Sequence, residues 1–105
     1  MDENIIESLI TEKTSAIIPV HYAGVACDLD EIMRIAEKHS LYVIKDAVLE
    51  FDRFYRTKSL CGIGHLGCLA FHQTKNLQCA EGGALVVNDN RFLNRVINIL
   101  EKGQI

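Results

Sequence analysis

No apolar run in this sequence approaches the roughly 18–20 residues that a helix needs to cross a bilayer. An excess of basic residues is also missing. The net charge is −3, which gives no electrostatic reason to expect nucleic acid or an anionic membrane as a partner. The N-terminal residues Met1 to Asn4 are acidic, whereas a secretory signal begins with basic residues. These absences predict a cytoplasmic protein with neither kind of partner.

Cys-x-x-Cys spacing is missing as well. With no export signal, a disulfide framework is not expected, and buried free thiols are the ordinary interpretation. The four cysteines are Cys27, Cys61, Cys68 and Cys79.

The 105 residues are 49% hydrophobic and 24% charged, which is typical of one folded domain. Apolar residues alternate between helical and strand spacing along the chain. An Asp28-x-x-Glu31 pair predicts a helix start, and Gly103 is placed to end the last helix, which Asp89 or Asn90 can cap. We predict helices at 3–11, after Asp28 and after Asn90, strands at 16–20, 41–44, 68–71 and 83–87, and an exposed ribbon at 51–57.

Strand–helix–strand order at this spacing indicates an α/β fold, a mostly parallel sheet with flanking helices. Strands that are apolar almost throughout are usually buried on both faces of the sheet. The few predicted helices cannot cover both faces, so the sequence is interpreted as an excerpt of a larger domain.

Two candidate functional residues follow predicted strands, at the carboxyl ends where parallel sheets usually bind ligands. Asp46 directly follows the predicted strand 42–45, and the carboxyl end of such a strand favours functional groups, although a helix cap or turn is an equal alternative. Lys75 lies 29 residues further on, just past another predicted strand. A lysine desolvated in a cleft can offer a neutral amine for a Schiff base, whereas most lysines are simply solvated.

Five segments surround these residues, and their order and spacing resemble the DegT/DnrJ/EryC1/StrS family of sugar aminotransferases, which are pyridoxal-phosphate enzymes of fold type I. The similarity extends over nearly the whole chain. Each segment is a weak signal by itself, but the ordered series is specific. The segments are residues 18–28, 43–47, 64–68, 71–76 and 81–84.

The resemblance implies roles for individual residues. The family's Asp-Ala pair falls on Asp46 and Ala47, and its aspartate binds the protonated pyridine nitrogen of pyridoxal phosphate. The family's lysine falls on Lys75, which would form a Schiff base with the cofactor and transfer protons during the reaction. Gly82 and Gly83 would let the chain turn tightly into the next strand.

Two positions depart from the family pattern. Leu49 stands where the family usually has glutamine or histidine against the cofactor ring, and leucine cannot hydrogen-bond to it. Ala70 stands where the family usually has a serine that contributes to phosphate binding. Both departures remove a polar contact to the cofactor.

The resemblance further implies transfer of an amino group, with glutamate as donor, to a nucleotide-linked 4-keto-6-deoxy-sugar for surface polysaccharide synthesis. Relatives act as homodimers. Residues 1–105 would form a single partial large domain, without the family's upstream phosphate-binding loop and downstream substrate domain. The alternative is a truncated, non-catalytic remnant or a module that binds another protein through its sheet edges.

Two further motifs give other interpretations. Residues 62–67 fit Gly-x-Gly-x-x-Gly, but the dinucleotide fingerprint needs a strand before it and a helix after it, and neither is predicted here. Cys61, His65, Cys68 and His72 are of the right types to bind zinc, yet their spacing fits no common zinc finger. We therefore predict loop glycines and no metal.

Overall fold

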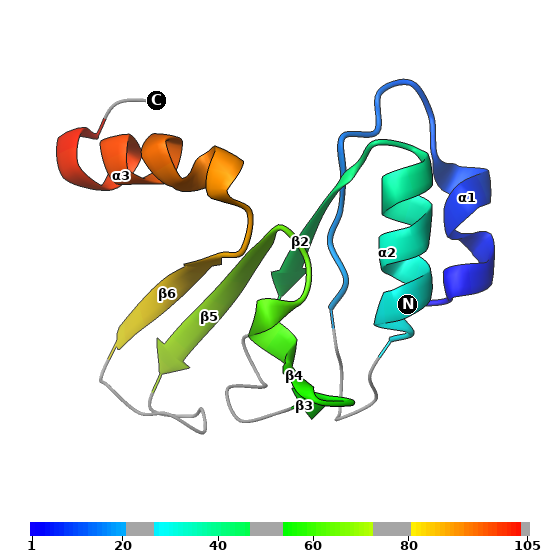
Figure 1. The fold of residues 1–105 in the computed structure, drawn as a ribbon, viewed down its shortest axis with the longest axis horizontal. Coiled ribbons are helices and arrows are strands. Elements are labelled where there is room, and N and C mark those ends of the chain that lie inside the picture. The colour runs from blue at the N-terminus through cyan, green and yellow to red at the C-terminus, as the bar shows by residue number, and fades with distance from the viewer. Residues whose placement is uncertain (21–26, 47–53, 73–80, 104–105) are drawn as a thin grey trace.

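The structure, a computed structural model, describes residues 1–20, 27–46, 54–72 and 81–103 (Figure 1). Within these residues a four-stranded sheet has the order β1-β2-β5-β6. The first three strands are parallel and β6 is antiparallel to β5. The sheet is therefore mostly parallel, as predicted. Its strands are β1 (Ala16–Ile17), β2 (Tyr42–Asp46), β5 (Leu66–His72) and β6 (Glu81–Val87).

In the described part of the chain, three α-helices accompany the sheet, close to the positions predicted. They are α1 (Ile6–Leu9), α2 (Leu29–Lys38) and α3 (Leu93–Lys102), and the 3-10 turns η1 (Glu3–Ile5) and η3 (Asn90–Phe92) precede α1 and α3. No helix in the described ranges is both long and apolar enough to span a membrane.

The start of α2 forms as the sequence predicts, with one difference. The Asp28 side chain accepts a hydrogen bond from the Glu31 backbone N–H at 3.1 Å, which caps the helix. The Glu31 side chain pairs with Arg34 instead of reaching back to Asp28. Glu3 accepts the Asp28 N–H in its place, at 2.5 Å, so the cap also ties the N-terminal turn to α2.

The hydrophobic core lies where α2 packs on β1 and β2. The side chains of Ile32, Ala36 and Val43 are almost completely buried there. By contrast, α3 has no buried residue, although its apolar residues recur at helical spacing. Figure 1 shows α3 standing apart from α1 and α2, beyond the start of β2 and the end of β6.

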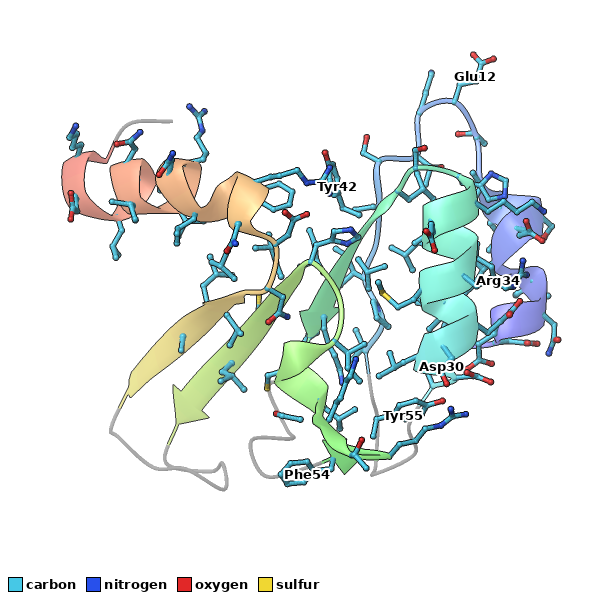
Figure 2. All side chains as sticks on the ribbon, in the orientation of Figure 1. Glu12, Asp30, Arg34, Tyr42, Phe54 and Tyr55 are labelled. Atoms are coloured by element: carbon cyan, nitrogen blue, oxygen red, sulfur yellow. The ribbon has the colours of Figure 1, made fainter. Side chains whose placement is uncertain are left out.

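A small antiparallel hairpin, β3 (Phe54–Tyr55) and β4 (Lys58–Ser59), forms the predicted ribbon in its described part. The Tyr55 hydroxyl donates to Asp28 at 3.3 Å, and Arg56 pairs with Asp30 at 2.9 Å. The hairpin is thus anchored to the first turn of α2. It lies at the end of the molecule toward which β2 and β5 point (Figure 2).

Three local predictions differ from the structure. Of the predicted strand at 16–20, only Ala16–Ile17 forms β1. Gly82 and Gly83 do not form a turn but lie inside β6, opposite Phe71 and Ala70 of β5. The first helix is also shorter than predicted, because α1 ends at Leu9. Gly103 has a φ of 60° and follows α3, as predicted.

The contact between α1 and α2 predicts an acid-sensitive contribution to stability. Glu7 accepts hydrogen bonds from Lys38 and His39 at 2.7 and 2.8 Å, and these bonds lower its pKa from 4.5 to about 2. A carboxyl whose folded pKa is lowered stabilises the fold above its unfolded pKa. That contribution is lost as the pH falls from about 4.5 through about 2.

We therefore expect Glu7→Gln to flatten the dependence of unfolding free energy on pH in this range, measured by urea denaturation. Glu12 lies exposed on the turn after α1 (Figure 2), and Glu12→Gln is the matched control. Equal slopes for the wild type and Glu7→Gln would contradict the expectation.

Candidate cofactor site

Asp46 is the last residue of β2 and lies at the carboxyl end of this inner parallel strand. Its backbone N–H donates to the carbonyl of Pro19 at 3.2 Å, and an isolated bridge joins it to Val20. On the other side its register partner is Cys68 of β5. The backbone of Asp46 is therefore held between two neighbouring segments, and its side chain is half-buried.

The alternation along β2 shows which face of the sheet carries the carboxylate. Val43 and Lys45 are buried on the core side, whereas Ile44 and Asp46 point to the opposite face. Register partners in a sheet share a face, so Cys68 lies on the same side as Asp46, and so does Ala70, two residues further along β5. The position that lacks the family's serine thus faces the same side as the carboxylate.

The other predicted site residues cannot be placed. Lys75, Ala47 and Leu49 lie outside the described residues. β5 ends at His72, three residues before Lys75 in the sequence, and β5 is the parallel neighbour of β2. Asp46 and the end of β5 at His72 therefore lie on the side of the sheet formed by the carboxyl ends of parallel strands, where ligands gather in α/β proteins.

Residues 62–67 do not form a dinucleotide-binding loop. They run from the end of η2 (Leu60–Gly62) into β5, so a strand follows the glycines, as predicted, and no helix N-terminus is available for a pyrophosphate. Gly64 has a φ of 94°, and a Cβ on Gly67 would come within 2.9 Å of the Cys61 carbonyl oxygen. These glycines serve a tight turn and a close backbone approach.

The four residues of the alternative zinc pattern are not gathered into a site by the described residues. Among these residues no group of three or more His, Cys, Asp or Glu side chains could hold a metal ion. The Nδ1 of His65 accepts a hydrogen bond from the Val43 N–H at 2.9 Å, which occupies one of its two possible ligand atoms. Cys61 is buried, and the side chain of His72 lies outside the description.

Two residues have environments that the sequence did not predict. Lys45 directly precedes Asp46 and is completely buried on the core side of β2, although burial of a charged group is costly. The sequence pattern suggests a zinc ligand or a loop residue at His65, whereas its side chain binds the backbone of β2. No spacing in the sequence signals either environment, because both depend on how distant segments pack.

Comparison with known proteins agrees with this geometry. The chain is 46% identical over 95 residues to the uncharacterised protein MJ1066 of Methanocaldococcus jannaschii, covering 90% of this chain and 24% of that protein. It resembles Helicobacter pylori PseC, an aminotransferase involved in pseudoaminic acid biosynthesis, with 31% identity and a TM-score of 0.91 over 100% of this chain and 28% of that one. It also resembles DesI, solved in the presence of its TDP-sugar product, with 27% identity and a TM-score of 0.87 over 94% of this chain and 25% of that one.

The fold is therefore an α/β domain of the aminotransferase type. The chain belongs to the DegT/DnrJ/EryC1/StrS aminotransferase family, whose model matches residues 1–105. Matching structures include the PLP and PMP forms of Spr1654 from Streptococcus pneumoniae, consistent with pyridoxal phosphate as the cofactor. The chain spans about a quarter of the length of the relatives described above.

Proposed function

We propose that this chain carries part of the cofactor site of a pyridoxal-phosphate-dependent sugar aminotransferase, in which Asp46, Ala47 and Lys75 contact the cofactor. The observation that carries the proposal is the position of Asp46, a half-buried carboxylate at the carboxyl end of β2 on the face opposite the core. Family membership supports the same assignment. An anionic acceptor there suits the protonated pyridine nitrogen of the cofactor.

Bound pyridoxal phosphate supplies an electron-withdrawing ring that stabilises negative charge on the amino-bearing carbon. Asp46 holds the proton on the ring nitrogen by accepting its hydrogen bond. Lys75 would hold the cofactor through its amine and would be the group that moves a proton to or from the reacting carbon. Ala70 faces the same side as Asp46 but offers no hydroxyl to the phosphate, so other groups must hold that end.

For the substrate, we propose a nucleotide-linked 4-keto-6-deoxy-sugar, with glutamate as the amino donor. PseC is involved in the biosynthesis of pseudoaminic acid and DesI has a TDP-sugar product, which supports a sugar substrate. The order of motifs in residues 18–84 resembles that of the dTDP-4-amino-4,6-dideoxygalactose transaminase of enterobacterial common antigen synthesis, which supports this choice of substrate. A cytoplasmic homodimer in surface polysaccharide synthesis follows from that assignment.

The reaction can be tested by its balance of products. Glutamate and the keto-sugar should give 2-oxoglutarate and the amino-sugar in equal amounts, measured by mass spectrometry with the cofactor present. Lys75→Ala should abolish both products together. Absence of both from the wild-type chain, across several nucleotide-linked keto-sugars, would contradict catalysis by this chain.

A non-catalytic, protein-binding role is the second candidate. It is favoured by α3, which exposes Leu93, Ile97 and Leu100 and has no buried residue. Uncovered apolar surface of this kind is typical of a face that packs on another protein or domain. Bound cofactor without amino transfer would favour this candidate over the enzyme.

A further inference from the structure

His65 connects three segments at the end of the sheet opposite Asp46. It lies just before β5, and its backbone N–H donates to the Val43 carbonyl of β2 at 2.8 Å. Its own carbonyl accepts from the backbone N–H groups of Asn88 and Asp89, directly after β6, at 3.0 and 3.2 Å. The residue therefore joins the beginning of β2 to the end of β6.

The imidazole ring adds a fourth bond that depends on its protonation. Its Nδ1 accepts the backbone N–H of Val43 at 2.9 Å, which requires that Nδ1 carries no proton and that the proton of the neutral ring is on Nε2. A protonated imidazole has an N–H at both nitrogens and cannot accept. The Val43 N–H, on the edge of the buried core, would then lose its partner.

The charged neighbours of the ring do not replace this bond. Arg91 donates hydrogen bonds to the carboxyl of Asp89, and these bonds lower the pKa of Asp89 to about 2. The charge of His65 lowers the same pKa by a smaller amount. The ring of Tyr42 forms T-shaped contacts with His65 and with Phe92, with ring centroids 5.4 and 5.1 Å apart. Figure 2 shows Tyr42 between the sheet and the start of the α3 segment. His65 and Tyr42 line a cavity of about 740 Å³. Three charged residues of α2 line it as well, namely Asp30, Arg34 and Glu37.

We propose that His65 is a proton-sensitive latch that closes the amino end of β2 onto the β5–β6 pair. The neutral ring binds the Val43 N–H and fixes the register of β2. Protonation breaks that bond and loosens the junction that Tyr42 and Phe92 pack against. The same register sets Asp46, three residues beyond Val43, opposite Cys68. The latch itself does not depend on the proposed function, because no cofactor takes part in it.

The wild-type 105-residue chain and two variants test the latch through urea denaturation at about pH 8 and about pH 5.5, the range in which histidines change charge. His65→Asn keeps an acceptor near the Nδ1 position and does not titrate, whereas His65→Ala removes the acceptor at both pH values. Effects of His39, which pairs with Glu7, are common to all variants and cancel.

The wild type and His65→Asn should have similar stability at the higher pH. At the lower pH the unfolding equilibrium constant of the wild type should rise about five- to tenfold relative to His65→Asn, as expected for one hydrogen bond. A constant difference between these two proteins at both pH values would overturn the latch. His65→Ala should be the less stable variant at the higher pH.

A direct measurement on the wild type covers the case in which a variant fails to fold. Nitrogen-15 NMR of the imidazole should show the proton on Nε2 at about pH 8, the tautomer that leaves Nδ1 free to accept. Amide hydrogen exchange of Val43, corrected for its intrinsic rate, should show less protection at about pH 5.5 than at about pH 8. A proton on Nδ1 at the higher pH, or unchanged protection of Val43, would overturn the proposal.

Discussion

Asp46→Ala is expected to weaken the binding of pyridoxal phosphate about 10- to 100-fold, the effect of removing one hydrogen bond between charged groups. The carboxylate stands at the end of β2, where backbone contacts to Pro19 and Cys68 fix its position. It is half-buried, so its interaction with the ring nitrogen is less screened than at an exposed site. Titration of the protein with the cofactor, followed by absorbance, measures the change.

Two further variants test the site, one by removing the charge of Asp46 alone and one by adding a hydroxyl on the same face. Asp46→Asn keeps the size of the side chain but not its charge, so its affinity should fall between those of the wild type and Asp46→Ala. Ala70→Ser restores a hydroxyl on the same face and should tighten cofactor binding, the opposite direction. Equal affinities for the wild type and Asp46→Ala would exclude Asp46 as a cofactor contact.

Gly67→Ala is expected to lower the free energy of unfolding by about 1–3 kcal/mol, the usual cost of forcing extra volume into a packed site. A Cβ there would lie 2.9 Å from the Cys61 carbonyl oxygen and 3.5 Å from Val86 Cβ. The nearer atom is backbone, so a rotamer change cannot relieve the contact. Thermal denaturation should show a lower melting temperature, by about 4–8 °C for each kcal/mol in a domain of this size.

Gly62 is the matched control, because it belongs to the same glycine-rich segment and a Cβ on it would meet nothing within 4 Å. Gly62→Ala should change the unfolding free energy by no more than about 0.5 kcal/mol. A similar loss for both variants would mean that general flexibility of the segment, and not the close approach at Gly67, sets the requirement for glycine.

Features encoded by neighbouring residues could be predicted from the sequence. The capping of α2 by Asp28 and the end of α3 at Gly103 each depend on a few adjacent residues, and both form as predicted. The position of Asp46 at a strand end was predictable for the same reason. Asp46 ends a short strand whose apolar residues Val43 and Ile44 come just before the polar pair Lys45 and Asp46.

Features that depend on distant segments could not be predicted. The bond between His65 and Val43 joins residues 22 apart in sequence, and nothing in their spacing indicates it. The antiparallel direction of β6, which places Gly83 opposite Ala70, is likewise a property of the assembled sheet. The burial of Lys45 runs against the general rule that lysines are exposed, so composition and pattern could not show it.

The central claim is that Lys75 is the residue that attaches the cofactor beside Asp46. The most direct test is to mix the chain with pyridoxal phosphate, reduce the mixture with borohydride, digest it, and locate the added mass by mass spectrometry. Lys45, which also neighbours Asp46 but is completely buried on the core side, is the internal comparison. The proposed site predicts the label on Lys75 and not on Lys45, with no labelled peptide from that region in Lys75→Arg. A label on other lysines with Lys75 unmodified would contradict it.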